Sequence, residues 1–240
     1  MNPTPTSTKR YGREALSIWR LGFARLLPRW WQILLIVGVG AALVVLDLRS
    51  WDHKLLQQIR QPDNEALTLT ARSFSKWGDV IWAAMLAIVL FIVGWKFGCP
   101  RWRQIAWAIL ISVLASTVIL NSFRLTLGRA RPGALNANGK PANGFYGPHL
   151  RDHKFHSFPS GHATSAFAPA AAVAAASPLI GAPCLLFAGC VSWSRLQLNQ
   201  HHPLDVVTGA VLGSLIGLSF GSAVPGARIR MRRRKRSLSR

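Results

Sequence analysis

Apolar residues along this chain gather in six runs, separated by segments that are polar or contain Gly and Pro. The runs cover residues 31–46, 80–95, 105–120, 163–176, 185–193 and 206–224. A membrane-spanning helix needs about 20 apolar residues, and the first, second, third and sixth runs approach that length. The fourth and fifth runs need their flanks, or burial among other helices. The pattern therefore predicts an all-α fold, a polytopic membrane bundle of six transmembrane helices.

The stretch before the first run has a different pattern. Residues 14–27 mix apolar and basic side chains at helical spacing, which is typical of an amphipathic helix lying on an anionic membrane surface. A cleaved signal peptide is the alternative, but no clear cleavage site follows the first run, so an uncleaved span is favoured. We expect a basic cytoplasmic N-terminal segment (1–31) containing the interfacial helix, a six-helix membrane domain (32–224) and a basic cytoplasmic tail (225–240).

Charge orients this bundle. The chain has 29 Lys and Arg against 8 Asp and Glu, a net charge of +21, which suits nucleic acid, anionic lipid or a phosphorylated substrate. Basic residues gather in segments 1–31, 96–103 and 225–240, which six spans place on one side, the cytoplasmic side by the positive-inside rule. Because this charge lies beside the spans, we expect anionic lipid at the basic termini and no nucleic acid. The oligomeric state stays open.

The opposite face collects three polar clusters from distant parts of the chain. They are Arg124-x6-Arg131-Pro132, Phe158-Pro159-Ser160-Gly161-His162, and the stretch from Ser194 to Asp205. Arg124, Arg131 and Arg195 are guanidinium groups that can grip oxyanions in a fork geometry. Ser160 can donate its hydroxyl, and Gly161 allows an anion close to its backbone N–H at the start of the following helix. The clusters predict an anion site.

Two histidines and a carboxylate add reactive groups to that site. His162 and His201 can serve as acid, base or nucleophile near neutral pH. Pro203 suits the first position of a helix, which would bring Asp205 under the ring of His201. Only scattered acids, such as Asp52, accompany them, so we expect no metal and no cofactor, and metal-independent phosphoryl transfer. Taken alone, residues 194–205 are equally compatible with an inert His–Asp pair in an interhelical loop.

The three clusters together resemble the signatures of the type 2 phosphatidic acid phosphatase superfamily, which is shared with vanadium haloperoxidases. Pro159-Ser160-Gly161-His162 and Ser194-Arg195-x5-His201-x3-Asp205 match the second and third signatures fully. The first signature, Lys-x6-Arg-Pro, appears here with Arg124 in place of the usual Lys. This change keeps the charge but replaces a point charge with a planar fork. Arg129, a basic neighbour, is a further candidate for phosphate contact.

The resemblance implies a lipid phosphatase and assigns roles to the matching residues. The implied catalytic residues are His201 as the nucleophile that forms a phosphohistidine, His162 as the acid and then the base, and Asp205 as the group that orients His201. The implied phosphate-binding residues are Arg124, Arg131, Ser160, Gly161 and Arg195.

The resemblance also bounds the substrate and the setting of the enzyme. It implies a lipid phosphate or diphosphate: undecaprenyl diphosphate, phosphatidic acid, phosphatidylglycerol phosphate or a lipid A phosphate. We expect a multi-pass protein of the plasma (inner) membrane with the active site on the periplasmic or extracellular face. The alternatives are a vanadate-dependent haloperoxidase-like activity and a catalytically silent protein that binds anionic lipid.

Overall fold

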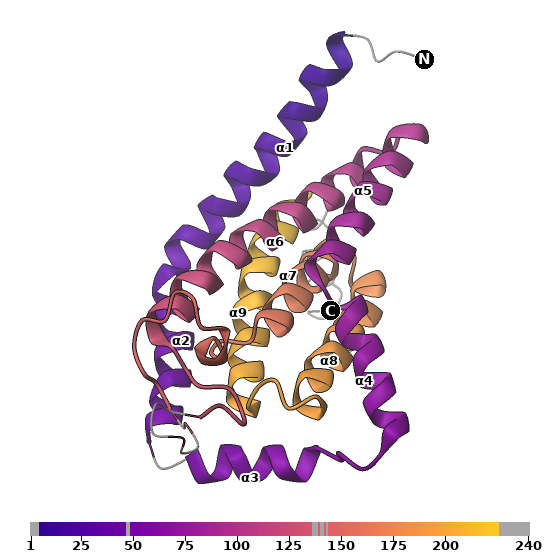
Figure 1. The fold of residues 1–240 in the computed structure, drawn as a ribbon. Helices are drawn as coiled ribbons and strands as arrows, with labels where there is room; N and C mark the ends of the chain where they lie inside the picture. The colour runs from indigo at the N-terminus through magenta and orange to yellow at the C-terminus, as the bar shows by residue number, and fades with distance from the viewer. Residues whose placement is uncertain (1–4, 47–48, 136–138, 140–141, 143, 226–240) are drawn as a thin grey trace, which may run out of the picture.

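The computed structural model describes residues 5–46, 49–135, 139, 142 and 144–225, and the predicted basic tail beyond 225 lies outside them. These residues form an all-helical bundle, as the sequence predicted (Figure 1). Its α-helices are α1 (Pro5–Leu26), α2 (Trp30–Val45), α3 (Arg49–Ile59), α4 (Glu65–Trp77), α5 (Val80–Lys96), α6 (Pro100–Leu127), α7 (Gly161–Ala176), α8 (Pro178–Gln197) and α9 (Pro203–Gly221). Two short 3-10 turns, η1 (Leu27–Arg29) and η2 (His153–Phe155), complete it.

The centre of the bundle is the pair α7 and α9. Helix α7 is rich in Ala, and α9 turns glycines toward it at four-residue spacing. A Cβ atom built on Gly213 would lie 2.5 Å from the carbonyl oxygen of Thr164, and one on Gly217 would lie 2.1 Å from that of Ala168. Only small residues let two helix backbones approach this closely. This contact aligns the first turns of α7 and α9, where the second and third sequence clusters lie.

The N-terminal helix packs along the bundle. Residues Arg10–Val45 form one 36-residue helical stretch, because η1 joins α1 to α2 without a loop. Ile18 is fully buried. The buried Arg103 on α6 donates its Nη2 and Nε atoms to the two carboxylate oxygens of Glu14, over 2.8 and 3.0 Å. A Cβ atom on Gly22 would collide with the ring of Phe220 on α9. An interfacial helix over residues 14–27 is therefore not confirmed.

The number of membrane spans also differs from the prediction. Among the described residues, four helical stretches are long and apolar enough to cross a membrane: Arg10–Val45, Pro100–Leu127, Pro178–Gln197 and Pro203–Gly221. The pair α4–α5, bent by 53°, makes a fifth if it is counted as one span. Helix α7 has only 16 residues, nine of them buried. A multi-pass helical bundle is confirmed, and six separate spans are not.

Three segments that lie between the apolar runs are wholly or partly helical. Residues 48–78 contain α3 and α4, separated by a turn at Pro62–Asn64. Helix α6 continues seven residues beyond the apolar run, where the hydroxyls of Ser122 and Thr126 bond to carbonyls of the preceding turn, and it ends before Gly128 with φ +60°. Helix α8 begins directly after Ser177 and contains Pro183, so segment 177–183 belongs to the start of this helix.

Helix α3 lies across one end of the bundle (Figure 1). Its inner face carries Asp52 and Leu56, which are 0% and 2% exposed. Trp51, the neighbour of Asp52 on α3, is half exposed. Leu56 packs on Ala163, Leu196 and Val206, the first or last turns of α7, α8 and α9. Helix α3 has few apolar positions, so the hydrophobic pattern of the sequence does not reveal it.

Candidate active site

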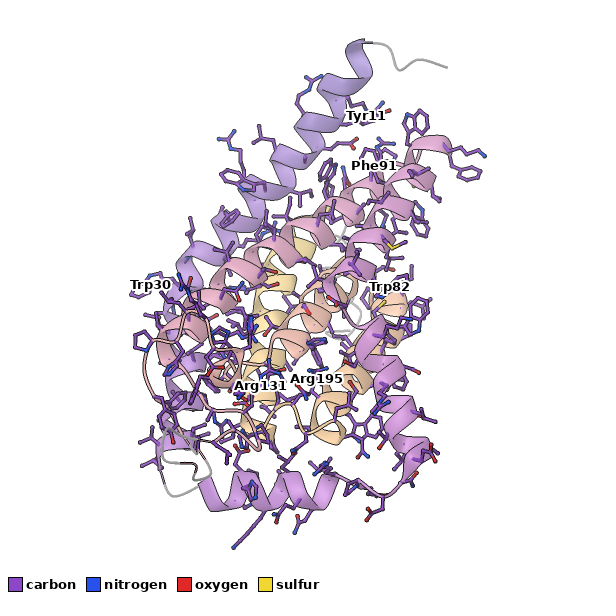
Figure 2. The ribbon with its side chains drawn as sticks, viewed as in Figure 1. Tyr11, Trp30, Trp82, Phe91, Arg131 and Arg195 are labelled. Carbon is purple, nitrogen blue, oxygen red and sulfur yellow. The ribbon has the colours of Figure 1, made fainter. Side chains whose placement is uncertain are left out.

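The three predicted clusters meet at the end of the bundle that α3 covers. The last turn of α6, the first turns of α7 and α9 and the last turn of α8 converge there, together with the segment between α6 and α7. The backbone N–H of Ser160 donates to the carbonyl oxygen of Asp205 over 2.9 Å, which ties the second cluster to the third. Figure 2 shows Arg131 and Arg195 beside each other at this end, close enough for their charges to interact. The predicted co-location is thus confirmed.

Arg124 occupies the last turn of α6, beyond the apolar part of the helix. Its Nε and Nη2 atoms donate to the carbonyl oxygen of His156 at 3.3 and 2.9 Å, which fixes the guanidinium plane. Its Nη1 atom lies where a Cβ on Gly161 would be 3.0 Å away. Any side chain at 161 would crowd this arm, so Gly161 lets the guanidinium lie against the first residue of α7.

Arg131 and Arg195 each have one anchored arm. The Nη1 atom of Arg131 donates to Gln200 Oε1 over 2.7 Å, and the Nη1 atom of Arg195 donates to Ser75 Oγ on α4. Burial lowers the pKa of Arg131 from its usual value. The Nε atoms of both arginines and the hydroxyl of Ser160 are buried and have no hydrogen-bond partner among the residues that the structure describes. Buried donors of this kind normally find a partner, so together they indicate a site for an oxyanion.

His201 is almost fully buried between α8 and α9. Its Nδ1 atom lies 2.8 Å from the carbonyl oxygen of Ser157. A carbonyl oxygen can only accept, so Nδ1 carries the ring proton and Nε2 keeps its lone pair. Burial lowers the pKa of His201 to about 4, although the negative charge of nearby Asp205 raises it. The ring is therefore neutral at pH 7 and has a nucleophilic nitrogen.

Asp205 is linked to His201 through Ser157, a residue that the sequence alone does not reveal. Asp205 Oδ2 lies 3.7 Å from His201 Nδ1, which is too far for a hydrogen bond. Ser157 donates its hydroxyl to Asp205 Oδ2 over 2.6 Å, and the same hydroxyl lies 3.5 Å from His201 Nδ1. The N–H of His202 also donates to Oδ2, over 2.8 Å. Ser157 lies outside all three signatures, so nothing in its spacing marked it.

Arg129 has a different place from the one suggested by its sequence neighbours. Its Nη1 atom donates to Asp205 Oδ1, and its Nη2 atom donates to Asp52 Oδ2 over 2.6 Å. The two carboxylates raise its pKa against the effect of burial. Both terminal nitrogens of Arg129 pair with carboxylates, and only its Nε atom is left without a partner among the described residues, so its contact with phosphate stays a prediction. Asp52 is a second residue that the sequence did not reveal.

His162 lies in the first turn of α7, where it is partly exposed. The positive charges of Arg195, Arg124 and Arg131 act on it, so it lies close to the arginines of the site. Among the described residues, no group of three or more His, Cys, Asp or Glu side chains is placed to hold a metal ion.

An apolar cavity of about 340 Å³ begins one helical turn from His162. It runs between α5, α7 and α8, and its lining includes Trp82, Leu86, Ser165, Pro169, Val173 and Phe187. Ser165 follows His162 by three residues, so both lie on one face of α7. The apolar cavity therefore lies one helical turn along α7 from the polar site.

Known membrane phosphatases are similar to this chain in sequence and in fold. The chain is 27% identical over 215 residues to a lipid A 1-phosphatase of Rhizobium johnstonii, covering 83% of each chain. It is 29% identical over 138 residues to the undecaprenyl-diphosphatase BcrC of Bacillus subtilis, covering 57% of this chain and 67% of that protein. The crystal structure of a PAP2-type phosphatidylglycerolphosphate phosphatase from Bacillus subtilis has a TM-score of 0.59 at 18% identity, covering 82% of this chain and 94% of that one, and so shares the fold.

The family model of the PAP2 superfamily matches residues 105–228, more than half of the 240 residues. The matched range contains all three clusters, from Arg124 to Asp205. The chain therefore belongs to the PAP2 superfamily.

Proposed function

We propose that this protein is a metal-independent membrane phosphatase that removes a phosphate from a lipid headgroup through a phosphohistidine at His201. One observation carries the proposal. The neutral imidazole of His201 has its free electron pair on Nε2 and lies within electrostatic reach of Arg131 and Arg195, whose buried Nε atoms have no partner in the described part of the chain. This is the arrangement that a nucleophile attacking a bound phosphate requires.

The proposed reaction has two steps. In the first, Nε2 of His201 forms a bond to phosphorus, the bond from phosphorus to the lipid oxygen breaks, and His162 gives that oxygen a proton. In the second, His162 takes a proton from water, the water oxygen bonds to phosphorus, and the P–N bond breaks to release phosphate and neutral His201. Arg124, Arg131, Arg195, Ser160 and the N–H of Gly161 hold the phosphoryl oxygens throughout.

The substrate we favour is a lipid A phosphate. The relative that matches over 83% of its length carries the name lipid A 1-phosphatase, and the apolar cavity beside His162 gives acyl chains a place next to the reacting headgroup. Undecaprenyl diphosphate, phosphatidic acid and phosphatidylglycerol phosphate are the competing substrates.

The proposed setting is the plasma (inner) membrane, with the active site on its periplasmic side. The start of α1 and the Lys96–Arg103 segment lie at the end of the bundle opposite to the site, and both are basic (Figure 1). Basic segments favour the cytoplasmic side, which leaves the site outside. Anionic lipid at the basic N-terminal segment is part of the same proposal.

The test is phosphate release in detergent with EDTA present, across the four lipid phosphates. We expect activity that EDTA leaves intact, highest on lipid A phosphate, and none in His201→Ala. Wild-type enzyme incubated with labelled substrate and quenched should hold an acid-labile, base-stable phosphoryl group, which His201→Ala should lack. Full activity in His201→Ala, or loss of activity on chelation, would contradict the mechanism. Halide oxidation after vanadate loading, without phosphate release, would favour the haloperoxidase alternative.

A further inference from the structure

We propose that Asp52, on α3, is a positioning residue for the reaction at His201: it neutralises Arg129 and so keeps the negative charge of Asp205 available to the histidine. This inference rests on the proposed function, because it concerns the charge that the ring acquires during phosphoryl transfer. Asp52 lies outside the matched segment 105–228 and outside all three signatures.

The contacts form an unbroken chain of buried groups from α3 to the nucleophile. Asp52 is 0% exposed and accepts from Arg129 Nη2 over 2.6 Å. Arg129 is 3% exposed and donates its other arm to Asp205. Asp205 accepts the hydroxyl of Ser157, whose carbonyl oxygen accepts from His201. No link in this chain passes through solvent.

The formal charges of Asp52, Arg129 and Asp205 explain why a second carboxylate is needed. Arg129 and Asp205 alone form a neutral pair, so Arg129 would cancel the charge that Asp205 presents to the ring. Asp52 pairs with the opposite arm of the same guanidinium. The trio then carries one net negative charge next to His201. Buried charges interact strongly, because little water screens them.

That net charge matters when Nε2 bonds to phosphorus, since the imidazole ring then becomes positive. A negative charge fixed in place beforehand stabilises the transition state without reorganisation. The other groups that face His201 oppose this change. Arg131 and Arg195 are cationic, and His162 becomes so when it takes a proton. The net negative charge of Asp52, Arg129 and Asp205 thus offsets the positive charge of the other groups around His201.

Asp52 also has a second contact, which a suitable variant can preserve. Its Oδ1 atom accepts the backbone N–H of Leu204, in the first turn of α9, over 3.0 Å. In Asp52→Asn one oxygen remains to accept from Leu204, while the charge is removed. The variant therefore tests the charge separately from the position of α9.

The experiment compares Asp52→Asn with Leu56→Ala, which lies on the same face of α3 and loosens its packing without changing charge. We expect Asp52→Asn to lower kcat about tenfold or more at nearly unchanged KM, because the lost charge acts mainly in the transition state. Vanadate, which imitates the transition state on Nε2, should bind more weakly by a similar factor, whereas inhibition by phosphate should stay the same. Leu56→Ala should lower Tm and leave the ratio of vanadate to phosphate inhibition constants at the wild-type value.

The double variant Asp52→Asn/Arg129→Gln completes the test, because it restores one net negative charge at Asp205. Its kcat should exceed that of Asp52→Asn. If Asp52→Asn does not fold, the kcat of the double variant is compared with that of His201→Ala instead. Wild-type kcat and vanadate binding in Asp52→Asn, or a double variant as inactive as His201→Ala, would overturn the inference. Phosphate release by the wild type that His201→Ala abolishes keeps the proposed function in either case, whereas an inactive wild type refutes the function itself.

Discussion

The Nδ1 atom of His201 lies 2.8 Å from the carbonyl oxygen of Ser157, and this contact determines which ring nitrogen is free to react. The same serine places its hydroxyl 2.6 Å from Asp205 Oδ2. One residue thus fixes the tautomer of the histidine through its backbone and connects it to the carboxylate through its side chain. Ser157 belongs to none of the family's signatures, so its mutation tests a contact that the signatures do not include.

Ser157→Ala should separate these two contributions. The carbonyl contact stays, so the tautomer is retained, while the link to Asp205 is lost. We expect kcat to fall roughly tenfold, equivalent to about 1–2 kcal/mol for a hydrogen bond to a charged group, with KM nearly unchanged. Ser116→Ala is the matched control, because Ser116 is also buried but bonds only within α6. Equal kcat values in the two variants would contradict a role for the Ser157 hydroxyl.

Arg124 invites a replacement by the residue that the family usually carries. Arg124→Lys keeps the charge but loses the two-point contact with the His156 carbonyl. We expect kcat/KM to fall about tenfold in Arg124→Lys and about 100- to 1,000-fold in Arg124→Ala, the range for loss of an oxyanion donor. Steady-state kinetics on one lipid substrate measure both. If the Lys variant were as impaired as the Ala variant, the guanidinium fork would be essential, and not only its charge.

The close contact of α7 and α9 predicts an asymmetry between two glycines. Gly217→Ala puts a methyl group 2.1 Å from the carbonyl oxygen of Ala168, so the helices must separate, at a cost of about 1–3 kcal/mol. Gly38→Ala on α2 meets no atom within 4 Å and gains helix propensity of about 1 kcal/mol. Thermal unfolding in detergent should show a lower Tm for the first variant and an equal or higher Tm for the second. The opposite order would show that the small-residue contact is not limiting for stability.

Burial of neutral His201 predicts a loss of stability in acid. Its pKa falls from 6.5 in the unfolded chain to about 4 in the folded protein. Between these values the unfolded chain binds a proton that the folded protein does not, so the free energy of unfolding decreases as pH falls from about 6.5 to about 4. Tm measured across this range should fall further in the wild type than in His201→Gln, which cannot titrate there. Parallel curves would contradict the predicted shift.

The sequence predicted the site better than the architecture around it. The signature residues from Arg124 to Asp205 gather at one end of the bundle, as predicted, although the six separate spans behind that prediction are not confirmed. Pro203 begins α9, as its missing N–H suggested. Gly161 begins α7, as expected, and the neighbour that its missing side chain admits is Arg124.

What escaped the sequence depends on long-range contacts. Asp52 is an unremarkable acid in a polar stretch until α3 folds across the bundle and buries it against Arg129. Residues 121–127 look like a loop by polarity, yet their hydroxyls bond to the preceding helical turn. The N-terminal basic segment suggested a surface helix, whereas its pairing with Arg103 depends on a partner 89 residues away. Apolar periodicity contains none of this information.

The position of α3 has a consequence for how the protein can be divided. The segment that matches the family, residues 105–228, holds each signature residue, so it resembles a self-sufficient catalytic module. Its Arg129, however, would face Asp205 alone, and the base of α7, α8 and α9 would lose the cover that Leu56 provides. The first hundred residues are therefore not an accessory anchor. A chimera that joins this segment to an unrelated N-terminal half would inherit the motifs without the electrostatic balance in which they work.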